Sequence, residues 1–254
     1  EGITRKSKLC IFQEIRVYWG GYSQVAVELF LMEQALAGVY DYYHIISGAD
    51  IPLKSNREIH AFFEANAGKE FINLNEELVK NNPEIKRRTK LYHFLQDYRR
   101  RYHRQWINSC FIGLERSLLL LQMIAQVDRT KNLDWTIKYG SNWISISHEL
   151  VCCILKHKEK IGDVFSLTNC ADELFVQTIA YNCGFREKIY QPLPGENANM
   201  RLVDWSRGRN GSPYTFRSDD FEMLTSTPTL FARKFSETVD RKIIEQLYEW
   251  LEQR

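Results

Sequence analysis

The stretch YYHIISGADIPLKS, residues 42–55, sets the fold class of this chain of 254 residues. Its first six residues form an aromatic and β-branched run, which is typical of a buried strand. The following Gly-Ala-Asp-Ile-Pro-Leu segment breaks the strand, and Ser55 or Asn56 then caps a helix predicted to continue to Phe63. Strand and helix therefore follow one another closely, as they do in α/β proteins.

Segments on both sides continue this alternation. Further strands are predicted at residues 9–18 (one or two strands), 71–74, 135–138, 143–147 and 201–205. Further helices are predicted at residues 24–36, 111–127, 148–158, 173–182, from 218 onward, and 238–253. The order indicates one α/β domain over residues 1–254, with a largely parallel sheet.

A basic segment covers residues 80–104, where two clusters of Lys and Arg are interleaved with aromatic residues. Nucleic acid is one interpretation, but a solvated helix face with an edge toward phosphate or sugar is the commoner one. The formal net charge of the chain is only +2. We therefore expect no nucleic-acid partner.

The six cysteines form no Cys-x-x-Cys pair, and no His lies at zinc-like spacing to them, so no metal site is predicted. A chain of this length does not need a disulfide framework, which favours a reducing compartment. The longest apolar run, residues 118–127, contains two glutamines and is too short to span a bilayer. We expect a cytoplasmic protein, associated with the inner face of the membrane peripherally if at all. Because the chain opens without Met, it looks like part of a longer protein.

Residues 167–179, LTNCADELFVQTI, predict a loop that runs into a helix. Asp172 and Glu173 then lie in the first turn, where the helix dipole favours negative charge and keeps Glu173 ionised near neutral pH. An ionised carboxylate at a fixed helix start could act as a general base. An acidic first turn that only stabilises its helix is the commoner interpretation of this segment alone.

Six stretches in chain order form a longer pattern: VYWGGYSQV (17–25), YYHIISGADIPLKS (42–55), YGSNWISISHELV (139–151), ADELFVQT (171–178), MRLVDW (200–205), and GSPYTF…DDFEML…LFARKF (211–235). Together they resemble glycosyltransferase family 14, the core-2/I-branching β-1,6-N-acetylglucosaminyltransferase family, which includes protein xylosyltransferases. The short loops are most similar to bacterial-type members. The resemblance implies a GT-A-like, Rossmann-type mixed sheet flanked by helices, with a nucleotide sugar at the strand ends. The chain begins after the strand and loop that hold the uracil base in this family, so we expect the first N-terminal strand to be missing.

The resemblance also implies an activity. Members invert the anomeric centre: a carboxylate deprotonates the acceptor hydroxyl, which attacks C1 of the sugar as the nucleoside diphosphate leaves. The expected donor is a UDP-sugar, with N-acetylglucosamine as the sugar, and the acceptor is a carbohydrate. The chain has no Asp-x-Asp motif, so we expect no metal and no cofactor, with basic side chains on the diphosphate instead. The alternatives are a xylosyl- or other hexosyltransferase of this family, and a non-catalytic glycan-binding protein that reads a glycan through Tyr139, Trp143 and the basic segment.

Individual positions follow from the same resemblance. Glu173 matches the general base. Arg201 and Lys234 match the cations on the diphosphate. Trp19 matches an aromatic residue near the nucleoside, and Asp50 belongs to the Ser-Gly-x-Asp-x-Pro stretch, which places it on the donor side.

On the acceptor side the expected residues are Trp143, Asp172, and Arg87 or Arg88. The four donor-side positions, Arg201, Lys234, Trp19 and Asp50, also have purely structural interpretations. Arg201 could lie at a strand edge, Trp19 in the core, and Asp50 in an Asx-turn. Lys234 could pair with a nearby carboxylate, of which Asp219, Asp220 and Glu222 are the candidates. Only the ordered set of stretches favours function.

Overall fold

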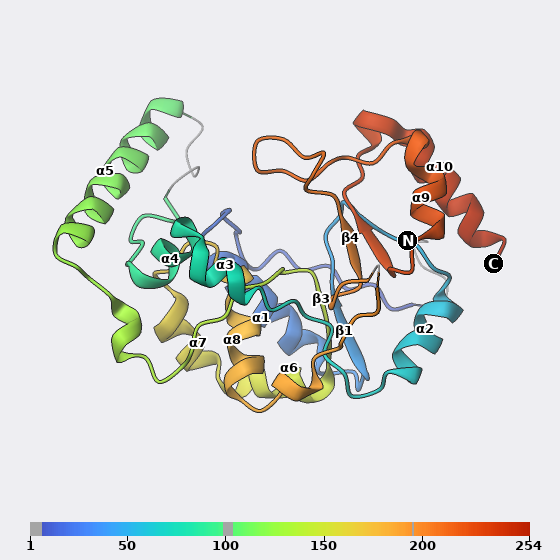
Figure 1. Cartoon of the computed structure of the whole chain (residues 1–254), viewed down its shortest axis with the longest axis horizontal. Coiled ribbons are helices and arrows are strands. Elements are labelled where there is room, and N and C mark those ends of the chain that lie inside the picture. Colours follow the sequence, from blue (N-terminus) through green and yellow to red (C-terminus); the bar gives the residue numbers. More distant parts are fainter. Residues whose placement is uncertain (1–6, 99–103, 195) are drawn as a thin grey trace.

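The computed structural model describes residues 7–98, 104–194 and 196–254, and it has α/β architecture (Figure 1). The α-helices are α1 Ser23–Ala35, α2 Asn56–Ala65, α3 Glu76–Asn81, α4 Pro83–Lys90, α5 Gln105–Ile124, α6 His148–Lys156, α7 Lys158–Phe165, α8 Phe175–Asn182, α9 Phe221–Ser226 and α10 Glu237–Glu252. The strands are β1 Tyr42–Ile45, β2 Asp50–Pro52, β3 Ile144–Ser147, β4 Arg201–Val203 and β5 Phe231–Arg233. Short 3-10 helices are η1 Arg129–Asn132, η2 Ala171–Glu173, η3 Arg186–Lys188 and η4 Ser218–Asp220.

The strands form two small sheets. In one, β1 pairs antiparallel with β3, with Tyr43 opposite Ile146. In the other, the order is β2-β5-β4, where β2 is antiparallel to β5 and β4 is parallel to it. The sheets are therefore mixed, and the prediction of a largely parallel sheet was wrong. Apolar runs identify strands, but the direction in which they pair depends on partners far along the chain.

The larger core packs helices α1, α6 and α8 against the β1–β3 pair, and Figure 1 shows these helices grouped beside the two strands. All four residues of β3 are buried, including its two serines. Val25, Leu150 and Ile179 lie within this core. A separate apolar cluster joins Ile51 of β2 to α10. The first cluster contains residues of β3 and α8, and the second contains residues of β2 and β5. These are the elements next to the predicted site residues.

Three predicted strands are not strands in the structure. Residues 9–18 form no strand, and most of their apolar side chains are exposed, with Ile11 at 73%. Residues 71–74 contribute only an isolated bridge between Phe71 and Ser145, and residues 135–138 form none. Strand propensity describes how side chains fit a pleated surface, but a strand also needs a neighbouring backbone with which to pair.

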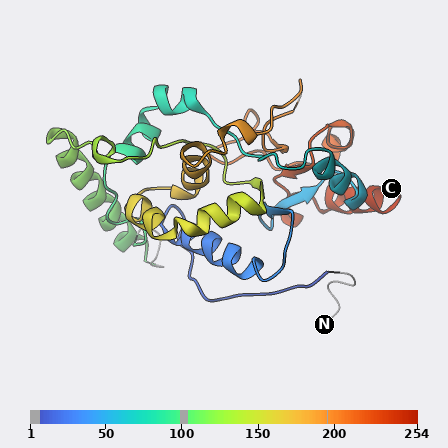
Figure 2. The same cartoon turned by 90° about the horizontal axis from the view of Figure 1, so that it is seen from below.

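Helix α5 lies at the end of the molecule opposite α10 (Figures 1 and 2). It begins at Gln105, earlier than the predicted residue 111, and by length and composition alone it could cross a membrane. Core helices and signal sequences pass the same test, but only 6% of the apolar window of α5 is buried. Its attachment to the body includes the buried Glu115, whose carboxylate accepts hydrogen bonds from Leu95 N and Gln96 Nε2.

Candidate active site

A cavity of about 440 Å³ opens between the segment that precedes β3, the turn η2 and strand β4. Its polar lining includes Asn73, Asn75, Ser141, Asn142, Asn197 and Asn199. Its aromatic lining consists of Tyr139, Trp143 and Trp205. Among the described lining residues, Glu173 and Arg201 carry charge. Amide groups and aromatic faces around two opposite charges suit a polar ligand with hydroxyl and anionic groups.

Glu173 does not lie in the first turn of an α-helix, as predicted. It ends the 3-10 turn η2, and α8 begins only at Phe175. Leu174 between them has φ −126° and ψ −41° and is buried in the core, while Cys170 takes a left-handed φ of 50° and donates its backbone N–H to the Gly20 carbonyl. These tertiary contacts shift the start of the helix and remove the dipole argument for Glu173.

The protonation of Glu173 also differs from the expectation of a carboxylate that is ionised near neutral pH. Burial raises the pKa of this carboxyl to about 7, although the nearby Arg88 lowers it. Arg88 Nη1 donates to Glu173 Oε2 at 2.8 Å, and its Nη2 donates to Glu84 Oε1 at 2.9 Å. Burial and the charge of Glu173 raise the pKa of Tyr139 to about 12. The prediction that the helix start keeps Glu173 fully ionised was wrong, but a carboxyl that titrates near neutral pH is well matched to proton transfer.

The buried Arg129 links the two segments that carry this ion pair. Its guanidinium donates to the backbone carbonyls of Thr89 at 2.8 Å, Val164 at 2.9 Å and Arg88 at 3.3 Å. It also donates to Thr168 Oγ1 at 2.5 Å. Arg129 thus ties the end of α4, which carries Arg88, to the segment that leads into η2 and Glu173.

Arg201 lines the cavity and is itself 2% exposed. Its guanidinium donates to the carbonyls of Asn199 and Ile144 and to Ser145 Oγ, and it lies over the Phe231 ring at 4.1 Å. Burial lowers the pKa of Arg201 to about 9, so the group is still charged at neutral pH. Its Nε has no partner and it makes no ion pair within the described part of the chain. A buried cation without a carboxylate partner favours an anionic ligand.

Asp50 does not face the cavity. Its side-chain carboxylate is 2% exposed, accepts a hydrogen bond from Ser47 N at 2.7 Å and pairs with Arg233 Nη1 at 2.9 Å. The Arg233 guanidinium in turn lies over the Trp143 ring at 4.3 Å. Asp50 was expected on the donor side, but it does not line the cavity, and its oxygens are occupied by Ser47 and Arg233. It positions Arg233, and through Arg233 it supports Trp143 on the cavity wall.

Three other predicted donor and acceptor residues lie outside the cavity lining. Lys234 follows β5 and donates from Nζ to Ser212 Oγ at 2.6 Å, not to the carboxylates of η4 and α9. Trp19 is 57% exposed, in the turn beside the Cys170 loop. Arg87 is exposed and lines a second cavity beside the C-terminal end of α5.

Asp172 is buried and is not one of the lining residues, but it supports the lining. Its Oδ2 accepts from Gln24 Nε2 at 3.0 Å and from Asn142 Nδ2 at 2.9 Å. Burial raises the pKa of this carboxyl. Asn142 lines the cavity, and Asp172 directly precedes Glu173 in η2. The Asp172 carboxylate therefore supports two lining residues without lining the cavity itself.

Several lining residues were not singled out by sequence reasoning. Asn199 donates its backbone N–H to Asn73 Oδ1 at 3.1 Å and its side-chain amide to the Trp143 carbonyl at 2.9 Å. Gly140 lies so close to Asn73 that an added Cβ would be 1.9 Å from the Asn73 carbonyl oxygen. The sequence offers little signal for this network beyond Asn197 and Asn199, which lie two residues apart.

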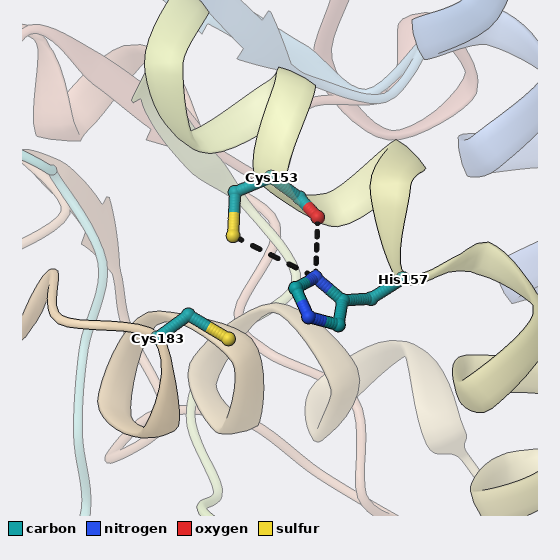
Figure 3. A group of neighbouring side chains, drawn as sticks. All are labelled: Cys153, His157 and Cys183. Carbon is teal, nitrogen blue, oxygen red and sulfur yellow. Dashed lines mark hydrogen bonds between the residues drawn. The ribbon is translucent and has the colours of Figure 1, made fainter.

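Among the described residues, one group of side chains away from the cavity could hold a metal ion. Cys153, His157 and Cys183 place one ligand atom each within 4.8 Å of one another (Figure 3). The spacing argument from the sequence did not single out Cys153 and His157, which are four residues apart. Four residues along a helix bring Cys153 and His157 to one face, while Cys183 arrives from the end of α8.

The sequence matches the family model described as "Branch: Core-2/I-Branching enzyme" over residues 6–228. The chain is 23% identical over 254 residues to xylosyltransferase 2 of Canis lupus familiaris, which covers 90% of this chain and 26% of that protein. It is 23% identical over 257 residues to xylosyltransferase oxt of Drosophila pseudoobscura pseudoobscura, covering 92% of this chain and 26% of that protein. The chain thus spans about a quarter of the length of these curated relatives. The match across most of the sequence shows that the chain belongs to the Core-2/I-branching enzyme family.

Proposed function

We propose that this protein is an inverting glycosyltransferase that moves a sugar from a UDP-sugar to a carbohydrate hydroxyl, with Glu173 as the general base. The observation that carries the proposal is the placement of Glu173 and Arg201 on the walls of one cavity, the former with a pKa of about 7. One group can accept a proton there and the other can hold an anion. The family match and the names of the relatives support the same class of reaction.

The proposed step is a single displacement. The acceptor oxygen forms a bond to C1 of the donor sugar, its proton moves to a Glu173 oxygen, and the bond from C1 to the diphosphate breaks. UDP leaves with the bonding electron pair. Arg201 stabilises the negative charge that develops on the diphosphate, and Lys234 adds to this if a bound donor draws it from Ser212. Arg88 orients the carboxylate and keeps a fraction of it ionised.

The asparagines and aromatic rings serve the sugar and the acceptor. Amide groups can both donate to and accept from hydroxyls, and Trp143 and Trp205 offer flat faces to the apolar side of a sugar ring. Arg233, stacked on Trp143, fixes the orientation of that ring.

The transferred sugar is either xylose or N-acetylglucosamine. The names of the relatives favour xylose, whereas the resemblance of the motifs to the branching enzymes favours N-acetylglucosamine. A glycan-binding protein without activity is the second candidate function, because Trp143 and Tyr139 would serve it equally well.

A donor screen distinguishes these candidates. The chain would be incubated with UDP-xylose, UDP-N-acetylglucosamine and UDP-glucose, with and without a panel of oligosaccharides, and released UDP would be measured. A transferase releases UDP from one donor and does so faster with its acceptor. Binding of an oligosaccharide without UDP release from any donor would contradict the transferase and favour the binding protein.

A further inference from the structure

The side chains of Cys153, His157 and Cys183 meet where helices α6, α7 and α8 come together. Figure 3 shows Cys153 and His157 on adjacent turns and Cys183 on the facing end of α8, with the three side chains directed toward one another. All three are half-buried. One possible ligand atom from each residue lies within 4.8 Å of the other two.

We propose that these three residues bind a Zn²⁺ ion, with two thiolates and one imidazole nitrogen as ligands and water in the fourth position. Two sulfurs and one imidazole are a ligand set that zinc takes in proteins, in tetrahedral geometry. Zinc needs ligand distances of about 2.0–2.3 Å. Small side-chain rotations would bring the three atoms from their present separation of up to 4.8 Å to that geometry.

The orientation of His157 favours a ligand role. Its Nδ1 lies 2.8 Å from the Cys153 carbonyl oxygen, which can only accept, so Nδ1 carries the proton. The lone pair of the neutral ring is then on Nε2, which Figure 3 shows on the side of the ring nearer Cys183. A ligating His usually donates its other ring N–H to a carbonyl or carboxylate in this way. Trp135 packs against the ring at 5.7 Å and limits its rotation further.

The same helix carries a pair that serves as an internal comparison. His148 Nε2 lies 3.4 Å from Cys152 Sγ, which is again a His and a Cys four residues apart. Among the described residues no third ligand joins this exposed pair. The spacing of Cys and His along the helix is therefore the same in both pairs. Only the Cys153–His157 pair has a third possible ligand, Cys183.

Zinc at this position would join the α6–α7 junction to the C-terminal end of α8. Glu173 lies just before the opposite end of α8, so the ion would stabilise the helix that supports the cavity without entering the ligand space. On binding, each thiol loses its proton to solvent and forms a bond from sulfur to zinc.

The test is a titration of the whole chain, stripped of metal under reducing conditions, with Zn²⁺ in competition with a chromophoric chelator. Wild type and Cys152→Ser should each bind one zinc per chain and melt at a higher temperature when zinc is present. Cys153→Ser and Cys183→Ser each remove a ligand, so they should weaken binding by more than the roughly 10–100-fold that loss of an outer-shell partner costs, and they should show no rise in melting temperature.

Cobalt offers an independent readout, because bonds from thiolate to Co²⁺ give an intense charge-transfer absorption. We expect this band in wild type and Cys152→Ser and not in Cys183→Ser. If a cysteine variant fails to fold, His157→Gln provides the same test. Absence of zinc binding by wild type, or equal losses in Cys152→Ser and Cys153→Ser, would overturn the proposal.

Discussion

Arg88 Nη1 donates to Glu173 Oε2 at 2.8 Å, and this ion pair joins helix α4 to the turn before α8. The Glu173 side chain is half-buried, and this partial loss of solvent nevertheless raises its pKa to about 7. Burial therefore outweighs the cation. Arg129 donates to the Arg88 carbonyl and to Thr168 Oγ1 in the segment before η2, so the geometry of the pair also depends on a residue far from either partner in the sequence.

The first prediction concerns pH. A base must be ionised before it takes a proton, so turnover should fall as the pH drops through about 7. Arg88 lowers the pKa of Glu173, so Arg88→Gln should move this acidic limb to higher pH. The matched control is Arg87→Gln, which changes the exposed neighbour. Turnover would be measured across neutral pH in wild type and both variants. A fall in turnover at the same pH in all three proteins would contradict the prediction.

The second prediction concerns UDP. Lys234→Ala removes one cation, and a charge-assisted contact is worth roughly 1.5–3 kcal/mol, so the affinity for UDP should fall by about 10- to 100-fold. Arg201→Lys keeps the charge but cannot reproduce the planar set of donors, and it should weaken UDP by on the order of 10-fold. Calorimetry would measure both affinities, with the exposed Arg209→Ala as control. If both folded variants bound UDP as tightly as wild type, Arg201 and Lys234 would not be the residues that bind the diphosphate.

The third prediction concerns stability. Arg129 is 8% exposed and donates to three carbonyls and one hydroxyl. Lysine cannot satisfy all of them, and a buried acceptor left without a partner costs about 1–3 kcal/mol. Arg129→Lys should therefore lower the free energy of unfolding by roughly 3 kcal/mol, as measured by urea denaturation. A loss below about 0.5 kcal/mol, the level of a surface substitution such as Arg209→Lys, would show that the clamp contributes little.

The fourth prediction concerns metal in the transfer step. The chain has no Asp-x-Asp motif, and cations on the diphosphate can take the place of a divalent ion. Transfer should therefore persist in EDTA. The Cys183→Ser variant is the background for this measurement, because the proposed zinc site cannot then contribute to the result. Loss of transfer on chelation, restored by manganese, would contradict metal-independent transfer.

Local sequence signals predicted much of the fold. The run YYHI formed β1, ISIS formed β3, and the apolar spacing of residues 24–36 formed α1, because each segment could be recognised from its own residues. The direction of strand pairing was not predicted, because it depends on contacts between segments about 100 residues apart, such as Tyr43 and Ile146.

The candidate site was predicted in part. Glu173, Arg201 and Trp143 do line one cavity. The environment of each residue was not predictable, because burial sets the pKa of Glu173 and an ion pair with Arg233 occupies Asp50. Cys183 joins Cys153 and His157 only through helix packing, which no local spacing reveals.

The most direct test of the account compares two carboxylates that contact the same arginine. Glu173→Gln keeps the shape of the side chain but cannot accept the proton, so turnover should fall by roughly 10²–10⁴-fold while the affinity for UDP barely changes. Glu84→Gln removes the other, largely exposed partner of Arg88 and should leave turnover within a few-fold of wild type. Near-wild-type turnover in Glu173→Gln, or an equal loss in Glu84→Gln, would contradict the role of Glu173 as the base.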